Sequence, residues 1–297
     1  MLIAAIAASG SAQQVPPAAA QNPSPMTEST RRHERLVEHA LAGAARTFTG
    51  PAGKPVEVFV PDAARGQGTF HLVIHFHGAA WVANQATAAA DRRAVTATLN
   101  LGTGSGVYHR AFVDAAAFDS LVAGVEREVA TATGNPAHAG RITLTGWSAG
   151  HGAIRAILLD SAHFARVNDV LLLDGMHTSY VPEGRVLALG GTLDTTNLAA
   201  FAAFARAAAR GEKRFLVVHS EIFPGTFAST TETADWLLAA LGLRREPVLR
   251  WGPRGAQQLS EARAGRFALL GFAGNSAPDH VDLLHGMPDF LARLLGR

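Results

Sequence analysis

The sequence predicts a single α/β domain with a doubly wound, mostly parallel sheet. Segments with strand composition alternate along the chain with segments of helical period. Several of the strand segments are continuous apolar runs, which is expected where helices cover both faces of a parallel sheet. A serine bracketed by glycines also stands at one strand-to-helix junction, in the stretch TLTGWSAGHGAIRAIL (143–158).

The composition narrows the class of protein. The chain has 297 residues, 48% of them hydrophobic, which is enough to bury one large core. Its 26 Lys and Arg and 24 Asp and Glu leave a formal net charge of +2, so we expect no polybasic face and no nucleic-acid partner. The absence of cysteine excludes disulfides, a thiolate nucleophile and a Cys-ligated zinc site. No stretch reaches about 18 uninterrupted apolar residues, so no transmembrane segment is expected.

Two short segments precede the expected domain. Residues 1–12 are predicted to be a signal peptide, because an apolar run is followed by Gly10 and Ala12, spaced like a cleavage site. This predicts export to the periplasm or the extracellular space. An Ala-rich leader without a targeting role is the alternative, since no Lys or Arg precedes the apolar run. Residues 13–30 are rich in Pro, Ala and Gln and are predicted to be a tether. The domain is expected to span 31–297.

The remaining elements follow in order along the chain. Thr27 or Ser29 can cap a helix that carries one apolar stripe. This stripe consists of Leu36, Val37, Ala40 and Leu41. Strands are expected at 56–61, 71–78, 94–102, 141–146, 169–175, 214–219 and 266–274. Helices are expected at 118–134, from the serine junction to about 160, and at 198–211, 232–242 and 287–296.

The bend at Ser148 accounts for the two flanking glycines. A strand that turns into a helix over one residue strains that residue, and side chains two positions away on either side would collide. Glycine at 146 and 150 removes these collisions. The bend lifts Ser148 Oγ to the carboxyl edge of the sheet, close to the amide of the next residue and the start of the helix. We interpret GWSAG as a nucleophile elbow; a glycine-rich turn with an inert serine is the alternative.

The GWSAG motif, with a predicted strand before it and a predicted helix after it, resembles that of the α/β-hydrolases. The resemblance covers about 56–297 in element order and implies an inserted lid region around 176–212. That family also carries an H-G stretch after its third strand, which VIHFHGAAW (73–81) matches. The resemblance implies an oxyanion hole formed by the backbone amides of Ala149 and Ala79. The stretch here reads H-G-A-A, without the glycine run of some lipases and esterases.

A serine nucleophile requires an imidazole base, and two histidines compete for this role. The family places its base after the last strand and shortly before the last helix, which leaves His280 and His285. His280 is preferred because it lies nearer the end of the strand. His285 stands one residue before Gly286, where capping of the final helix is the alternative role.

Three carboxylates could orient that base. Asp174 ends the apolar run VLLLD and would emerge at the carboxyl edge of the sheet, so it is preferred. The family more often takes its acid after the following strand, where this chain has Glu221. Asp194 is the third candidate, but it precedes a predicted helix and is better explained as an N-cap.

Other residues near these motifs have open roles. Trp147 and Trp81 are hypothesised to line an apolar substrate pocket, with a place in the core as the alternative.

His75 and His77 share one face of a strand, but no third ligand follows at short spacing, so no metal site is predicted. His77 is expected to brace the loop through its ring nitrogens. The glycine-rich stretch 102–112 lacks the spacing of a P-loop and is expected to be a mobile loop at the mouth of the site.

Together these patterns predict a serine hydrolase that cleaves a carboxylic ester, of a small molecule or a polymer, through an acyl-enzyme. No cofactor is required. Three alternatives stay open. An amide or peptide hydrolase would use the same triad, a noncatalytic binding protein could share the fold, and a metallohydrolase could be built on His75 and His77. The sequence leaves the oligomeric state undetermined.

Overall fold

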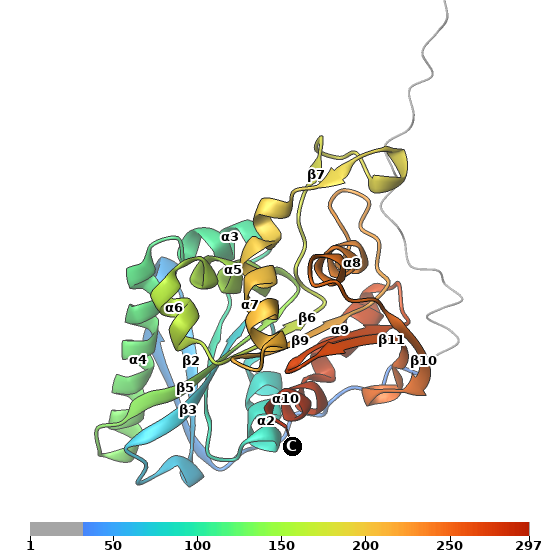
Figure 1. Cartoon of the computed structure of the whole chain (residues 1–297). Coiled ribbons are helices and arrows are strands. Elements are labelled where there is room, and N and C mark those ends of the chain that lie inside the picture. The colour runs from blue at the N-terminus through green and yellow to red at the C-terminus, as the bar shows by residue number, and fades with distance from the viewer. Residues whose placement is uncertain (1–31, 297) are drawn as a thin grey trace, which may run out of the picture.

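The computed structural model describes residues 32–296. The predicted signal peptide (1–12) and tether (13–30) lie outside the described residues. Within this range ten strands form one sheet (Figure 1). In spatial order they are β1 (Gly43–Thr49), β2 (Pro55–Pro61), β4 (Val95–Leu99), β3 (Thr69–Phe76), β5 (His138–Trp147), β6 (Asp169–Leu173), β9 (Arg214–His219), β12 (Phe267–Phe272), β11 (Gln257–Ala264) and β10 (Glu246–Trp251).

The centre of the sheet is parallel and its two ends are antiparallel. Strands β4, β3, β5, β6, β9 and β12 run parallel to one another. The pairs β1–β2, β2–β4, β12–β11 and β11–β10 are antiparallel. The carboxyl ends of the six parallel strands therefore meet at one edge, which is where open α/β sheets place their ligands.

Helices cover both faces of the sheet (Figure 1). One face carries α2 (Ala80–Ala90), α9 (Ala277–His285) and α10 (Met287–Leu295). The other carries α3 (Ser105–Ala111), α4 (Ala115–Thr133), α5 (His151–Leu159), α6 (Ser161–Arg166), α7 (Ala199–Ala209) and α8 (Thr230–Ala240). The predicted doubly wound, mostly parallel sheet is confirmed.

The central strands are unbroken apolar runs because each contributes side chains to two cores, one on each face of the sheet. In β6, Val170 and Leu172 pack into the core beneath α4 to α8, while Leu171 and Leu173 pack into the core beneath α2 and α10. Successive side chains of a strand point to opposite faces, so a strand buried on both sides needs an apolar residue at every position.

The predicted helix over about 29–41 is wrong for its described part, because residues 32–41 have no helix. Tertiary partners take the backbone groups that a helix would use. Leu36 N donates to His285 Nδ1 at 3.2 Å, His39 N donates to Gln85 Oε1 at 3.0 Å, and Gln85 Nε2 donates to the Val37 carbonyl at 3.2 Å. Val37 is 81% exposed, so the apolar stripe does not face a core.

The inserted segment is shorter than expected. Between β6 and α7 lies a small antiparallel pair, β7 (Tyr180–Val181) and β8 (Thr192–Leu193), which projects from the body of the domain (Figure 1). Helix α7 itself belongs to the layer that covers the sheet, since Phe201 and Phe204 are fully buried. The insertion therefore ends before α7 and does not extend to 212. None of the described helices is long and apolar enough to span a membrane.

Candidate active site

Ser148 stands at the sharp turn between β5 and α5, which a short 3-10 segment (Ser148–Gly150) makes. Its φ of 48° lies in the left-handed region, which non-glycine residues seldom adopt. A Cβ on Gly150 would lie 2.0 Å from the carbonyl oxygen of Phe76 on β3. A Cβ on Gly146 would lie 3.0 Å from Ile154 Cδ1 and 3.1 Å from the Gly150 carbonyl carbon. The two glycines thus permit close approach to β3 and to α5.

The H-G turn after β3 lies beside this bend and has two residues with positive φ, His77 at 68° and Gly78 at 136°. Its first two amides are engaged: His77 N donates to the Leu99 carbonyl at 3.2 Å, and Gly78 N donates to Asn100 Oδ1 at 2.9 Å. Asn100 Nδ2 donates back to the Gly78 carbonyl at 2.9 Å, so Asn100 binds both backbone groups of Gly78. Ala79 follows as the N-cap of α2, and its N–H forms no hydrogen bond within residues 32–296.

Asp174 follows β6 and is 2% exposed, with a φ of 46°. Its Oδ2 is 2.6 Å from His280 Nδ1 and also accepts a hydrogen bond from Ser220 Oγ at 2.6 Å. Its Oδ1 accepts from Ser220 N at 3.0 Å and from Thr230 Oγ1 at 2.8 Å. Four hydrogen bonds therefore hold the carboxyl group in one orientation.

These contacts also decide the charge of Asp174. Burial opposes ionisation, but the hydrogen bonds from His280 and Ser220 outweigh it and hold the pKa of Asp174 well below its ordinary value. An ionised Asp174 can only accept hydrogen bonds, so His280 must donate through Nδ1. The lone pair of the neutral imidazole is then on Nε2, the arrangement that a general base requires.

His280 lies in the first turn of α9, not in a preceding loop as expected. Ser276 caps this helix and forms a reciprocal capping box with Asp279. Trp147 Nε1 donates to the His280 carbonyl at 3.0 Å, and the two rings lie 4.7 Å apart. The other neighbour of the indole is His77, which stacks at 5.2 Å with an interplanar angle of 12°. Trp147 therefore supports both the H-G turn and the His280 segment.

Within residues 32–296, neither alternative acid forms a hydrogen bond or ion pair with His280. Glu221 is exposed, and its backbone N–H donates to the Gly274 carbonyl at 2.9 Å. Asp194 is the N-cap of a short 3-10 turn, where its carboxylate accepts from Thr196 N at 3.1 Å and from Asn197 Nδ2 at 2.7 Å. Of the three carboxylates, only Asp174 contacts a histidine of α9.

The remaining sequence candidates are also placed. His285 closes α9, accepts the hydrogen bond from Leu36 N and packs its ring 5.6 Å from Trp81. Neither Trp81 nor Trp147 lines the cavities at Ser148. Trp81 instead packs against His285, and Trp147 packs against His77 and His280.

The two strand histidines take separate partners. His75 Nδ1 lies 2.9 Å from Thr145 Oγ1, and His77 Nδ1 lies 2.9 Å from the Tyr108 hydroxyl. That hydroxyl accepts from Leu101 N, so His77 reaches the loop backbone through Tyr108 and not directly through its own ring nitrogens. Burial lowers the pKa of His75 to about 3. Among the described residues, the one cluster with spacing for a metal comprises His33, Asp279 and Asp282, and it includes neither histidine.

Two pockets meet at Ser148. The first, here called the His280 pocket, has a volume of about 300 Å³ and is lined by Ser148, His177, Ile222, Pro224, Phe227 and His280, among others. The second, here called the Arg155 pocket, has a volume of about 580 Å³ and is lined by Ser148, Ser105, His151, Arg155, His177 and Asn197, among others. The nucleophile candidate is thus open to substrate from two sides.

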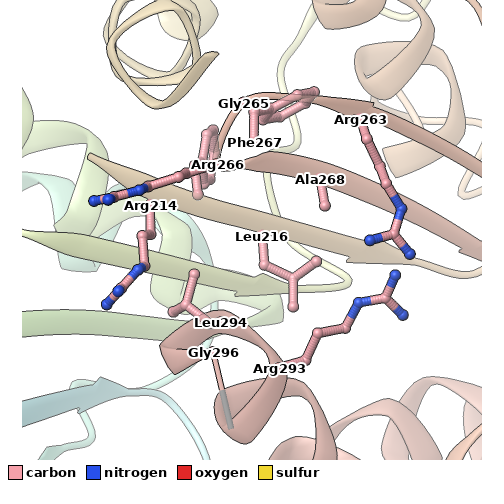
Figure 2. A pocket seen from close by; sticks show the side chains of 11 residues that line it. Arg214, Leu216, Arg263, Gly265, Arg266, Phe267, Ala268, Arg293, Leu294 and Gly296 are labelled. Atoms are coloured by element: carbon pink, nitrogen blue, oxygen red, sulfur yellow. The ribbon is translucent and has the colours of Figure 1, made fainter. Parts of the chain in front are cut away.

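A further cavity of about 230 Å³ lies at the opposite edge of the sheet (Figure 2). Arg214 begins β9 there, and Arg263, Arg266 and Arg293 complete its basic lining. Glu261 pairs with both Arg263 and Arg293. The described residues that line this cavity include no serine, histidine or carboxylate, so they supply neither a nucleophile nor a base. The candidate active site is therefore the one at Ser148.

Comparisons with known proteins bear on the fold alone. No family model and no curated protein sequence matches this chain. Among solved structures, a Pyrobaculum calidifontis esterase is similar at 13% identity, over 87% of this chain and 84% of its own, with a TM-score of 0.49. An ester hydrolase from the Lake Arreo metagenome is 15% identical over 88% and 85%, with a TM-score of 0.49. An arylesterase is 11% identical over 88% and 87%, with a TM-score of 0.47.

Proposed function

We propose that the protein is a serine hydrolase that cleaves carboxylic esters through an acyl-enzyme. One observation carries the proposal: Ser148, on a strained strand-to-helix turn, lines the same pocket as His280, whose Nδ1 is 2.6 Å from the buried carboxylate of Asp174. A hydroxyl, an imidazole with a free Nε2 and an orienting carboxylate are the three groups that nucleophilic acyl transfer requires.

In the proposed mechanism His280 Nε2 takes the proton from Ser148 Oγ as that oxygen bonds to the ester carbon. The carbonyl oxygen gains the negative charge of the tetrahedral intermediate. On its collapse the bond to the leaving alkoxide breaks, and His280 returns the proton to that oxygen. Water then attacks the acyl-enzyme by the same route and frees Ser148. Asp174 stabilises the imidazolium formed in each step.

We propose Ala149 and Ala79 as the oxyanion donors. Ala149 is the second residue of the turn that opens α5, where backbone N–H groups lack intrahelical acceptors. Upstream, the amides of His77 and Gly78 are already engaged, which leaves Ala79 N as the first free donor after β3. The two hydrogen bonds of Asn100 with Gly78 hold that turn rigid, and rigid donors are what stabilises developing charge at low cost.

The decisive test is Ser148→Ala. The variant should lose labelling by a fluorophosphonate, and its kcat for p-nitrophenyl acetate should fall by about 10⁴-fold or more. The matched control is Ser179→Ala, an exposed serine of the Arg155 pocket, which should still be labelled at Ser148. Full labelling of Ser148→Ala would refute the nucleophile. A wild-type protein that is neither labelled nor active on ester or amide substrates would favour a noncatalytic binding protein.

A further inference from the structure

Arg155 lines the pocket next to Ser148 and has most of its hydrogen-bond donors unused. Its one hydrogen bond within residues 32–296 runs from Nε to His109 Nδ1, at 3.4 Å. A guanidinium carries five N–H donors, so the four on its terminal nitrogens have no partner in the described part of the chain. No carboxylate oxygen of that part lies within 4.0 Å of it.

This lack of a counter-ion is costly for a half-buried cation. Burial lowers the pKa of Arg155, and the more distant Asp194 only partly offsets the loss of hydration. Arg141, by contrast, makes a bidentate pair with the buried Asp169 at 2.7 and 2.9 Å. A desolvated charge without a partner is unfavourable unless a ligand supplies one.

Arg155 is also the only charged group among the described residues that line its pocket, which include no Asp or Glu. Burial lowers the pKa of both histidines there, that of His151 to about 3, so both are neutral near pH 7. His151 Nδ1 lies 2.8 Å from the Ser148 carbonyl, which fixes the position of this ring beside the nucleophile. The charge that lines the pocket is therefore positive, and only the more distant Asp194 opposes it.

Arg155 and Ser148 line the same pocket, Ser148 from the turn that precedes α5 and Arg155 from α5 itself. An anionic group that pairs with Arg155 and an ester carbonyl at Ser148 can therefore belong to one molecule.

The two pockets differ in chemistry in a way that would orient such a molecule. Ile222, Pro224 and Phe227 make the His280 pocket largely apolar. The Arg155 pocket offers neutral polar groups from Ser105 and Asn197 around its single cation. One side of the scissile bond thus meets an apolar surface, and the other side meets a positive charge.

Resting on the proposed function, we infer that the substrate is an ester that carries a carboxylate, and that Arg155 binds this carboxylate while Ser148 attacks the ester carbonyl. The class comprises half-esters of dicarboxylic acids and hydroxy acids that are acylated on the hydroxyl group. Charge-assisted, bidentate pairing with a guanidinium supplies both the affinity and the orientation.

Two matched substrate pairs test the inference. Monomethyl adipate and the methyl ester of adipic acid monoamide differ in charge on the acyl side, and 4-acetoxybenzoate and 4-acetoxybenzamide differ on the alcohol side. We expect kcat/KM to favour the anionic member of at least one pair by about tenfold or more. In Arg155→Met this ratio should fall by a similar factor, and Arg155→Lys should restore part of it. Arg92→Met removes an exposed arginine and should leave the ratio unchanged.

The outcomes separate this inference from the proposed function. Hydrolysis and labelling without any anionic preference, or an equal ratio in Arg155→Met, would overturn the inference and leave the serine hydrolase intact. If no ester is cleaved, the proposed function fails. Titration calorimetry with adipate then tests whether Arg155 binds an anion. Adipate should bind Ser148→Ala about tenfold or more tightly than it binds Ser148→Ala/Arg155→Met. Equal affinity would overturn the inference.

Discussion

Two residues of the candidate site have strained backbones. Ser148 and Asp174 end the neighbouring parallel strands β5 and β6, and both have positive φ, at 48° and 46°. Such conformations cost about 1–3 kcal/mol each and persist where surrounding contacts over-determine them. Asp174 has these contacts in Ser220, Thr230 and His280. Strain at two adjacent strand ends is typical of functional sites. Here the two strained residues, Ser148 and Asp174, line the same pocket.

Asp174→Asn tests the orienting role. The amide nitrogen cannot accept the Nδ1–H of His280, so the imidazole loses the tautomer that leaves Nε2 free. We expect kcat for p-nitrophenyl acetate to fall by about 10³- to 10⁴-fold, with little change in KM. Glu221→Gln is the control, because that carboxylate is exposed and should lose less than threefold, a change of roughly 0.6 kcal/mol. A larger loss in Glu221→Gln would make it the acid.

The sequence could rank the acids but could not decide between them. Asp174 stands out only as the end of an apolar run, whereas its hydrogen-bond partners come from three other parts of the chain: Ser220 after β9, Thr230 at the start of α8 and His280 in α9. Asn100 likewise follows β4 and belongs to no motif, so its two hydrogen bonds with Gly78 could not be predicted from the sequence. Partners that lie far apart in sequence become visible only once the sheet is assembled.

At the scale of elements, α5 is packed tightly against α3 through Gly152. A Cβ there would lie 2.0 Å from the Ser105 carbonyl oxygen and 2.8 Å from its carbonyl carbon. Both contacts are with backbone, which cannot rotate away as a side chain can. The same helix pair borders the Arg155 pocket, since Ser105 and Arg155 both line it. The close approach of α3 therefore helps to shape the site.

Gly152→Ala tests this packing, because two effects oppose one another in it. Helix propensity alone favours Ala over Gly by about 1 kcal/mol. The backbone clash instead predicts overpacking, so we expect the free energy of unfolding to fall by about 1–3 kcal/mol in urea. Gly68→Ala is the control, since a Cβ at Gly68 meets nothing within 4 Å. A more stable Gly152→Ala would show that α3 moves aside freely.

The predicted elements were right where burial left a clear pattern. Strands with two buried faces, such as β6 and β9, are unbroken apolar runs. The peripheral strands β1 and β10 were not predicted, because none of their residues is buried and their apolar pattern is weak. Helix α2 was missed because its sequence, AWVANQATAAA, is mostly small residues without a strong apolar stripe. Helix α3 was missed because glycines at 102, 104 and 106 favoured a loop.

At the scale of the molecule, the topology assembles the site. His280 and Asp174 lie 106 positions apart in sequence, and the parallel sheet brings them to one edge. The placement of Asp174 was predictable because it follows a strand end, and the carboxyl ends of parallel strands share an edge. His280, which lies in the first turn of α9, was selected through the resemblance to the α/β-hydrolases. The roles of the two tryptophans were not predictable, since an indole beside a nucleophile can face a pocket or support a neighbouring segment. Export through residues 1–12 stays a prediction.

The whole molecule should also lose stability in mild acid, because several histidines are buried in neutral form. Burial lowers the pKa of His75 and His151 to about 3 and that of His219 to about 4. In the unfolded chain these groups have a pKa of about 6.5. Below that pH the unfolded state binds protons that the native state does not, so the folded state is favoured less as the pH falls. The stabilisation is complete above about pH 6.5 and is lost progressively toward pH 4.

His219 offers the sharpest test of this linkage. Its ring is fixed in the neutral form, because Nε2 lies 2.8 Å from Arg245 NH1, which can only donate, and Nδ1 lies 2.8 Å from the Ser220 carbonyl. Urea unfolding between pH 7.5 and 5 should show a falling free energy, by up to about 1.4 kcal/mol per pH unit for each such histidine. In His219→Gln the free energy of unfolding should fall less steeply from pH 7.5 to pH 5, whatever its value at pH 7.5. His138→Gln, at an exposed ring, should not. An unfolding free energy that is constant or rises toward pH 5 would mean that protons reach these rings in the native state.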